Sequence, residues 1–563
     1  MSLPDLIAVA RGDKPADLVL KNARIINVFT SSIEKNSVAI YGGRIAGIGD
    51  YTEGHKVIDL KGAYLSPGFI NGHIHIESSM LHPARYARTV VPHGVTSICT
   101  DLHEITNVAG LDGIRFVMNC ARTLPLDIFF QAASCVPATH METSGAAIGA
   151  PEIKKLLKWK NNIGLGEMMN YPGVINAFPS VIDEITAASG HVIAGHAPGL
   201  RGKQLNAYTA AGIYSDHENS EIEESREKLS RGLYLMIREG TSEKNLEELL
   251  CLVTDKTWHR CMFVVDDRSC ADLLRDGDVD AVVRKAIRLG LDPIRAIQLV
   301  TLNPAEYFRL HDLGRIAPGA RANLITFDNL EKLDIDLVFF NGKLTARGGK
   351  YLGKVTEKTP GRLLQTVNVK PFSRGSLELK ITQDEFPVIE IIPGQIITRK
   401  KMVTIPRGTF HADTGRDLLK AVVIERHRAT GNTGIGIVKG FGLKSGAIAS
   451  TVAHDSHNIV AVGSSDEDIL AAIKAIEEMQ GGLVVCHKGQ AIARLPLPIC
   501  GLLSPDPAEK VSVRFEALEK TAATLGRLPP APFALLSFIA LPVIPELRLT
   551  DMGIVDVVQF KLI

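Results

Sequence analysis

The chain has 563 residues, of which 45% are hydrophobic and 22% charged, and its formal net charge is +1 at pH 7. This length predicts two or three domains, and the near-zero charge excludes an overall field that would attract nucleic acid or an anionic membrane. The eight cysteines form no Cys-x-x-Cys pair, which disfavours a zinc ribbon or disulfide framework and favours a reducing compartment. The longest apolar stretch, Phe533 to Ile544, is interrupted by Ser537 and Pro542 and is too short to span a bilayer. We therefore expect a cytoplasmic protein.

Short β-type runs occur in two separate pieces of the chain. Residues 17–66 contain runs such as Ser37–Ile40 between Asn, Gly and charged turns, and similar runs return within residues 313–343. Such runs bounded by turn residues predict strands. Because the two pieces flank everything between them, we expect one small β-sandwich domain built from residues 1–66 and 313–358.

Residues 67–312 contain eight strand candidates that alternate with helix-like segments. Eight β-α units over this length predict a TIM (β/α)8 barrel as the catalytic domain, in an α/β fold. The helix-like segments include Glu152–Trp159, Val174–Ala188, Ser220–Leu229 and Ser242–Val253, which follow suitable Ser and Pro starts. The predicted strands are Phe69–Ile76, Val95–Asp101, Asp127–Val136, Asn162–Met168, His191–His196, Gly212–His217, Leu233–Arg238 and Met262–Asp266.

Polar residues collect at the C-terminal ends of these strands. Barrel active sites form on this face, so the placement disfavours the alternative fold, a doubly wound parallel sheet. The residues concerned are His73, His75, Asp101, His103, Glu167, His196, His217, Arg238 and Asp266.

The remaining region, residues 361–563, mixes strands with helices, and we expect a C-terminal α+β domain. Its glycine-rich run at residues 430–442 lacks the spacing of either phosphate-binding fingerprint, which favours turns and close backbone packing. The predicted elements are strands Leu418–Ile424, Ile459–Val462 and Gly482–Cys486, and helices Asp466–Met479 and Val511–Leu525.

The sequence His73-Ile-His75 places two imidazoles on one face of a predicted strand, since side chains repeat every two residues. Such a pair can hold a divalent metal, although two structural histidines beside a turn would give the same pattern. Other strand ends complete a set of N and O ligands, which suits Mn(II), Fe(II) or Zn(II). The expected metal ligands are His73, His75, Glu167, His196, His217 and Asp266.

Six ligands exceed what one open catalytic metal needs, so we expect two metals. Glu167 would bridge them, with His73, His75 and Asp266 on one metal, and His196 and His217 on the other. Metal-bound water has a pKa lowered toward about 7, and an adjacent carboxylate can accept its proton. These parts predict hydrolysis at an electrophilic carbon.

The strings at these strand ends resemble a known family. His-Ile-His after the first strand, histidines on strands five and six and an Asp on strand eight resemble the amidohydrolase superfamily. Longer strings, spread over nearly the whole chain, resemble its adenine deaminase branch; in this chain Asn71 and Leu102 replace an Asp and a Pro of the family pattern. The longer strings are residues 67–80, 101–108, 166–174, 195–200, 215–218, 266–268, 301–307, 453–458 and 541–547.

The resemblance implies hydrolytic deamination of adenine to hypoxanthine and ammonia by a metal-bound hydroxide, as in purine salvage and adenine catabolism. It also implies a binuclear Mn or Fe centre, with Glu167 at the position of the family's bridging glutamate. We expect Asp266 to relay the proton to the departing amine, with Asp267 as the alternative. A second polar group has to protonate ring atom N1. Candidates for contact with substrate or for proton transfer are Glu104, Glu77, Glu218, Asp267, His103 and His457.

Other functions remain as alternatives. One is an amidohydrolase acting on another amino-heterocycle, such as guanine or cytosine; another is a cyclic-amide hydrolase, which Glu167 disfavours because those enzymes carry a strand-four lysine. A scaffold barrel with a degenerate site is disfavoured because no expected ligand is missing. His454 and His457 form either a lid over the barrel mouth or a solvated turn. We expect adenine as the small-molecule partner, no nucleic acid or membrane partner, and a homo-oligomer of two or more chains.

Overall fold

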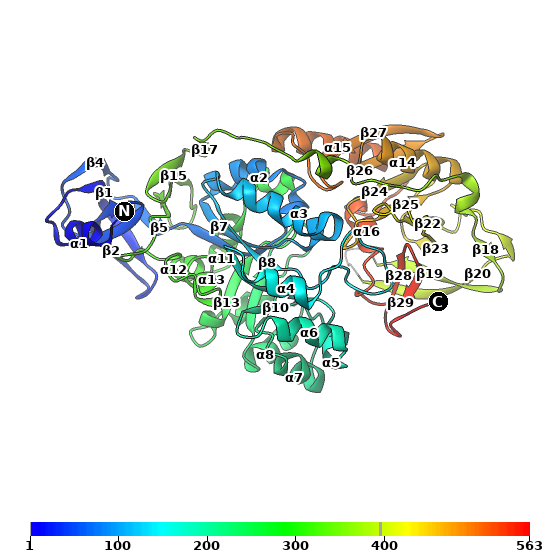
Figure 1. The fold of residues 1–563 in the computed structure, drawn as a ribbon, viewed down its shortest axis with the longest axis horizontal. Coiled ribbons are helices and arrows are strands. Elements are labelled where there is room, and N and C mark those ends of the chain that lie inside the picture. Colours follow the sequence, from blue (N-terminus) through cyan, green and yellow to red (C-terminus); the bar gives the residue numbers. More distant parts are fainter. Residues whose placement is uncertain (1, 393–396) are drawn as a thin grey trace.

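The computed structural model describes residues 2–392 and 397–563. Three regions follow one another along the long axis of the molecule (Figure 1): an N-terminal sheet, a central barrel and a C-terminal region. Strands from both sides of the barrel sequence join the N-terminal sheet. Among the described residues, no helix has the length and apolar character needed to cross a membrane.

The N-terminal sheet contains nine strands within residues 16–351, all of which are described. Its strand order is β17-β16-β15-β14-β5-β1-β2-β3, with β4 paired to β1. The antiparallel pairing of β5 with β14 joins the two flanks of the chain. Helix α1 (Leu3–Arg11), which the sequence did not predict, packs Leu6 and Val9 against this sheet. The strands are β1 (Ala16–Asn27), β2 (Ser32–Tyr41), β3 (Arg44–Gly49), β4 (Gly54–Asp59), β5 (Tyr64–Pro67), β14 (Leu324–Phe327), β15 (Ile335–Phe340), β16 (Lys343–Arg347) and β17 (Lys350–Tyr351).

The central region is an α/β barrel of parallel strands. One sheet runs β10-β9-β8-β7-β6 and a second runs β11-β12-β13. The Tyr214 amide donates to the Ile193 carbonyl (3.0 Å) between β10 and β11, and a parallel bridge from Ile74 to Asp266 closes the ring. All eight predicted strands are present. They are β6 (Phe69–Ile74), β7 (Val95–Asp101), β8 (Asp127–Ala132), β9 (Asn162–Met168), β10 (Ile193–Gly195), β11 (Ser215–Asp216), β12 (Tyr234–Arg238) and β13 (Cys261–Val264).

Two predicted helices differ from the structure. The segment 174–188 is divided, because Ala177 adopts a left-handed φ of 53° and Pro179 starts a new helix. The segment 242–253 keeps only a short helix, because residues 239–244 form an irregular bridged loop. The α-helices of this region are α2 (Pro83–Val90), α3 (His103–Ala121), α4 (Ala150–Leu156), α5 (Tyr171–Ile175), α6 (Pro179–Ala187), α7 (Gly202–Ala210), α8 (Ile222–Ser230), α9 (Leu246–Leu249), α10 (Cys270–Arg275), α11 (Val279–Arg288), α12 (Pro293–Gln298) and α13 (Leu302–Tyr307).

The C-terminal region is built around an eight-stranded sheet, counted over its described residues, in the order β20-β19-β23-β22-β25-β24-β26-β27. The glycine-rich run forms β23, where a side chain on Gly434 would collide with the Thr550 carbonyl; this confirms the predicted close backbone packing. The strands of the region are β18 (Lys380–Ile381), β19 (Glu385–Ile391), β20 (Thr398–Thr404), β21 (Gly408–Thr409), β22 (Leu418–Ile424), β23 (Thr433–Lys439), β24 (Ala447–Ser450), β25 (Ile459–Gly463), β26 (Gly482–His487), β27 (Gln490–Pro496), β28 (Leu547–Thr550), β29 (Gly553–Asp556) and β30 (Lys561–Leu562). Its α-helices are α14 (Asp466–Glu478), α15 (Ala508–Ala523) and α16 (Pro532–Phe538).

The C-terminal region is hydrogen-bonded to the loop that follows β8 in the barrel. The Thr550 hydroxyl donates to the Met141 carbonyl (2.6 Å), and the Asn458 amide donates to the Thr143 carbonyl (2.8 Å). Apolar side chains of both regions belong to one continuous core. These contacts hold the segment 453–458 against the C-terminal face of the barrel.

Candidate metal centre

The end of β6 carries the first part of the site. His73 lies in the strand and His75 directly after it, and both are buried. The Nε2 atoms of His73 and His75 each lie 3.3 Å from Oδ1 of Asp266. Asp266 follows β13 with a left-handed φ of 57°, and its amide donates to the His73 carbonyl (3.1 Å). Closure of the barrel between its first and last strands therefore brings these three side chains together.

Glu167, in β9, lies between two groups of histidines. Its Oε1 atom is 3.1 Å from Nε2 of His75. Its Oε2 atom is 2.9 Å from Nδ1 of His196 and 3.1 Å from Nε2 of His217. The two oxygens of one buried carboxylate thus face the two histidine groups, which is the arrangement that a bridging ligand requires.

The residues present fit a divalent metal. Among the described residues, the buried atoms His73 Nε2 and His217 Nδ1 make no hydrogen bond, and an orphaned buried polar atom costs about 1–3 kcal/mol. Ligand atoms lie within 4.8 Å of one another in three relevant groups. Imidazole and carboxylate donors without thiolate suit Zn, Fe or Mn. The groups are His73, His217 and Asp266; His73, His75 and Glu167; and Glu167, His196 and His217.

Electrostatics keep both carboxylates of the centre ionised. Burial would raise the pKa of Glu167, but His217, His196 and His75 outweigh it and hold that pKa well below its usual range. Burial likewise opposes ionisation of Asp266, and His217, His73 and His75 again lower its pKa well below the usual range. Each carboxylate is therefore a charged oxygen ligand at neutral pH.

Asp101 and Arg238 orient the groups of the centre. Asp101, at the end of β7, accepts hydrogen bonds from the amides of Glu167 (2.8 Å) and His103 (3.1 Å). Arg238, at the end of β12, lies 3.0 Å from Oδ2 of Asp266 and also contacts Glu218. Because both oxygens of Asp266 are engaged, its carboxylate is held in one orientation.

The segment 453–458 of the C-terminal region completes the site from above. Nδ1 of His454 lies 2.6 Å from Oε1 of Glu104, and His457 contacts the other oxygen of Glu104. His103 Nε2 is 3.4 Å from Glu104 and 3.7 Å from Asp455. Both histidines of the segment are withdrawn from solvent, so the solvated-turn alternative is wrong.

The pKa values of this polar cluster are strongly shifted from their usual range. Burial opposes the charge on Glu104, but His454, His457 and His103 outweigh it and hold its pKa well below the usual range. Burial similarly opposes protonation of His454, yet Glu104 raises its pKa to about 10. Burial raises the pKa of Asp455 to about 7, against the attraction of His103. Perturbed groups gathered in one cleft are typical of functional sites.

Comparison with known proteins shows to which family the chain belongs. Residues 64–345 match the amidohydrolase family, and residues 395–561 match the adenine deaminase C-terminal domain. An adenine deaminase of Dehalococcoides mccartyi is 58% identical over 564 residues, covering 100% of this chain and 99% of that protein. The chain belongs to the adenine deaminase family. Adenine deaminase 2 of Carboxydothermus hydrogenoformans is 46% identical with the same coverage. Among solved structures, a β-aspartyl dipeptidase of Fervidobacterium islandicum is 18% identical with a TM-score of 0.46, over 60% of this chain and 100% of that one.

In this member of the adenine deaminase family, the other predicted site residues separate into two groups. Glu104, His103, Glu218 and Asp267 line the cavity beside the ligand set. Glu77 and His457 do not line it: His457 contacts Glu104, and the Glu77 carboxylate accepts from the Ile105 amide (3.1 Å) in the first turn of α3. Burial, and then repulsion from Glu104, raise the pKa of Glu77 to about 7. This contact suits a role of Glu77 in starting α3, and its contact with substrate stays a prediction.

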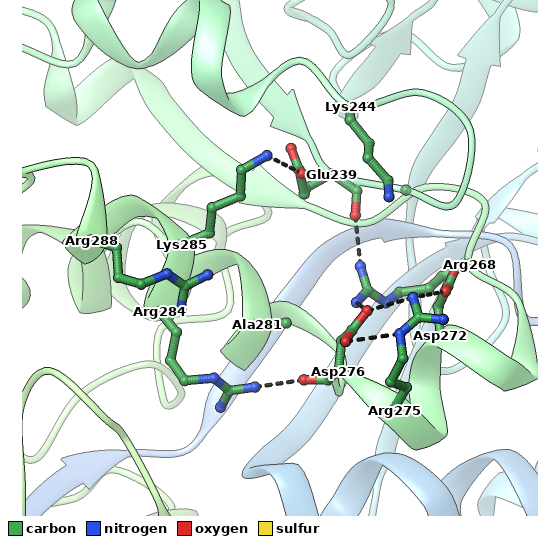
Figure 2. A pocket seen from close by; sticks show the side chains of 11 residues that line it. Glu239, Lys244, Arg268, Asp272, Arg275, Asp276, Ala281, Arg284, Lys285 and Arg288 are labelled. Atoms are coloured by element: carbon green, nitrogen blue, oxygen red, sulfur yellow. Dashed lines mark hydrogen bonds and ion pairs between the residues drawn. The ribbon is translucent and has the colours of Figure 1, made fainter. Parts of the chain in front are cut away.

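A larger cavity, of about 470 Å³, lies outside the ligand set of this family member (Figure 2). It borders Glu239 and Arg268, which follow Arg238 and Asp267 in sequence. Several of its cations are paired, as Figure 2 shows for Lys285 with Glu239 (2.5 Å) and Arg275 with Asp276 (2.8 Å). Nine of its eleven lining residues are charged, so this cavity offers little apolar surface to a flat base.

The sequence predicts no role for several residues of the site in this chain. Asp101 is predicted as a strand-end residue within the family string 101–108 but without a role, although its position two residues before His103 is a signal. Phe538, Leu541 and Ile544 line the cavity. The sequence indicates only that their apolar stretch is too short to span a bilayer and that residues 541–547 resemble the family. Met169, the other apolar lining residue, carried no signal beyond following Glu167.

Proposed function

We propose that the chain hydrolyses adenine to hypoxanthine and ammonia. The observation that carries this proposal is the position of Glu167, whose two oxygens face separate histidine groups. The full-length similarity to adenine deaminases supports the choice of substrate.

The same proposal includes two divalent metals, Mn(II) or Fe(II), with Zn(II) as a further choice. His73, His75 and Asp266 would hold one metal, His196 and His217 the other, and Glu167 both. When bound, such metals lower the pKa of water and supply a nucleophile at neutral pH. The unpartnered Nε2 of His73, which faces Asp266, supports this assignment among the described residues.

Asp266 is proposed to move the proton. Its carboxylate accepts the proton released by the attacking water and passes it to the amine as the bond between C6 and the exocyclic nitrogen breaks. Ammonia then leaves and hypoxanthine remains. Arg238 fixes Oδ2 of Asp266 at 3.0 Å, which leaves Oδ1 directed at His73 and His75. A positioned carboxylate of this kind contributes about 10²–10⁴-fold to rate.

Glu104 is proposed to serve ring atom N1. The ring nitrogen gains a proton as the tetrahedral intermediate forms, so a group that shares a proton must face it. Glu218 is engaged by Arg238, and Glu77 by the first turn of α3. Glu104 lines the cavity and has His454 at 2.6 Å, and the pKa of His454 is raised to about 10. His454 therefore carries the proton that Glu104 relays to N1. The second proton of the water returns to this pair when the C6 hydroxyl becomes the carbonyl of hypoxanthine.

An ammonia-release screen tests the function. The protein, loaded with Mn(II) or Fe(II), is assayed with adenine, adenosine, guanine, cytosine and a cyclic amide such as hydantoin. We expect release from adenine and not from adenosine, whose ribose would have to fit a closed pocket. Faster release from adenosine, guanine or cytosine, or ring opening of hydantoin alone, would reject the substrate assignment.

Finer features of the fold are proposed with this function. The division is a β-sandwich domain of residues 1–66 and 313–358, a catalytic barrel of residues 67–312 and an α+β domain of residues 361–563. The pairing of β5 with β14 supports the first of these. Free thiols at all eight cysteines support a cytoplasmic setting. Assembly into a homo-oligomer is proposed as well, and sedimentation of the purified chain tests it.

A further inference from the structure

The cavity beside the metal ligands has one polar side and one apolar side. Carboxylates, histidines and Arg238 of the barrel form the polar side together with His454 and Asp455 of the C-terminal region. Met169 of the barrel forms the apolar side together with Phe538, Leu541 and Ile544 of the C-terminal region. Three of these four side chains are buried, and Phe538 is half-buried. We call these four residues the apolar wall.

Buried Arg548 holds the backbone of this wall. Its guanidinium donates to the carbonyls of Ile544 (2.7 Å), Phe538 (3.0 Å) and Pro545 (3.0 Å). The Leu549 amide donates to the Ile539 carbonyl (3.0 Å). The end of α16 and the turn after it are therefore fixed to β28, and the apolar side chains keep a set position facing the barrel.

The apolar wall is continuous with the polar side through one stacked pair. The rings of Phe538 and His454 are 4.7 Å apart and inclined at 20°. His454 in turn reaches Glu104 at 2.6 Å. An aromatic face and a hydrogen-bonding group are thus adjacent on the same side of the cavity.

This pairing of surfaces fits a planar heterocycle. A purine has two apolar faces and a polar rim, and ligand sites commonly combine apolar lining with a few placed polar groups. We propose that the apolar wall, and Phe538 in particular, binds the face of the base while the barrel carboxylates meet its rim. The proposal rests on the proposed function, since it names the part of that site which selects a flat aromatic base.

The test compares two phenylalanines of the same helix. Phe538 lines the cavity, whereas Phe533, on α16, is buried against Phe515 and lies outside the lining. Phe538→Ala, Phe538→Leu and the control Phe533→Leu are loaded with Mn(II). Binding of hypoxanthine is measured by calorimetry, and kcat and KM for adenine are measured alongside metal content.

We expect Phe538→Ala to weaken hypoxanthine binding roughly ten- to a hundredfold, which is the usual effect of removing a base-stacking ring. KM for adenine rises in parallel, kcat changes little and two metals are retained. Phe538→Leu, which keeps apolar volume without the ring, gives a smaller loss in the same direction. Phe533→Leu leaves binding unchanged.

Wild-type binding in both Phe538 variants would overturn the proposal, as would an equal loss in Phe533→Leu. If Phe538→Ala does not fold, Phe538→Leu against Phe533→Leu decides alone. The two proposals fail separately. Ammonia release by the wild-type protein with unaltered binding in the variants rejects only the wall. Hypoxanthine binding that depends on Phe538, without release of ammonia from adenine, rejects only the function.

Discussion

Asp266 and Asp267 are neighbours in sequence but have different surroundings. Asp266 lies 3.3 Å from both His73 and His75, whereas Asp267 accepts a hydrogen bond from the Ser78 hydroxyl. The left-handed φ of Asp266 at the strand end turns consecutive side chains in different directions. This supports Asp266 as the proton carrier and Asp267 as a group of the cavity rim.

Exchange of Asp266 for Asn tests that assignment. We expect Asp266→Asn to keep much of its metal and to lose about 10²–10⁴-fold in kcat, because the amide cannot accept a proton. Asp267→Asn is the matched control and should lose far less. Ammonia release and metal analysis check both variants. A larger loss of kcat in Asp267→Asn would reverse the two roles.

Removal of Glu167 tests the bridge. Glu167→Ala deletes both oxygens that face the histidine groups, so we expect loss of bound metal and of deamination. Metal content after gel filtration and ammonia release are the measurements. A variant that keeps two metals and wild-type turnover would contradict the bridging role.

Among the individual residues, those on the barrel strands were the most predictable. His73 and His75 can be located from the sequence because side chains repeat every two residues along β6. Glu167 can be located because barrel active sites form at the C-terminal ends of the strands. The hydrogen bond that Glu77 accepts from the Ile105 amide could not be predicted, because it depends on how two loops meet. The sequence favours Asp266 over Asp267 by its place directly after the apolar strand but leaves the pair open, because their surroundings depend on the backbone conformation at the strand end.

At the scale of elements, the turn after α2 is linked electrostatically to α11. Nδ1 of His93, in the 3-10 turn Val91–His93, lies 3.1 Å from Asp280, which also pairs with Arg284 at 2.7 Å. Burial opposes the charge on His93, but Asp280 outweighs it and raises the pKa of His93. The same pair, against burial, lowers the pKa of Asp280. The turn and the helix are therefore joined most strongly when His93 is protonated.

This link gives a pH-dependent stability. Because the pKa of His93 is raised in the folded state, its contribution is complete below about pH 6.5 and is lost as pH rises through the folded pKa. The lowered Asp280 pKa matters only on acidification, below about pH 4. We expect His93→Gln to cost roughly 1 kcal/mol at pH 5.5 and less at pH 9. Thermal unfolding at both pH values checks this. An equal loss at both would contradict it, and adenine turnover, measured as a control, should not change.

Elements were predictable where periodicity is strong, and their junctions were not. The eight barrel strands and the helices of residues 466–478 and 508–523 carry their own patterns. The break at Ala177 and the shortened helix after residue 245 arise from single backbone conformations and loop bridging. The contact of His454 with Glu104 joins residues 350 positions apart, so no local pattern could locate it.

At the scale of the whole molecule, Asp551 fastens the C-terminal region to the barrel. It is buried, and it accepts from the Thr143 amide (2.9 Å) and from the side chains of Asn432 (3.2 Å) and Asn458 (3.4 Å). Asn458 ends the segment that carries His454. We therefore expect loss of Asp551 to affect the candidate site through the junction between the regions.

Asp551→Ala tests this junction in the full chain. We expect it to cost about 2–3 kcal/mol, because buried donors lose their acceptor, and to lower adenine turnover while the barrel keeps its metals. Asp384→Ala is the control, since Asp384 is 74% exposed in its pair with Arg407 and such surface pairs contribute little. Thermal unfolding, metal content and ammonia release are compared. Unchanged turnover in a destabilised Asp551→Ala would show that the junction supports folding alone.

The cavity between the metal ligands and the apolar wall encloses about 40 Å³. That is room for about two or three water molecules, far below the roughly 300–1,000 Å³ of a typical ligand pocket. We expect the barrel and the C-terminal segments to move apart when a bicyclic base enters and again when the product leaves. Association should then be slower than the diffusional encounter, and product escape rather than bond breaking would set the ceiling on turnover.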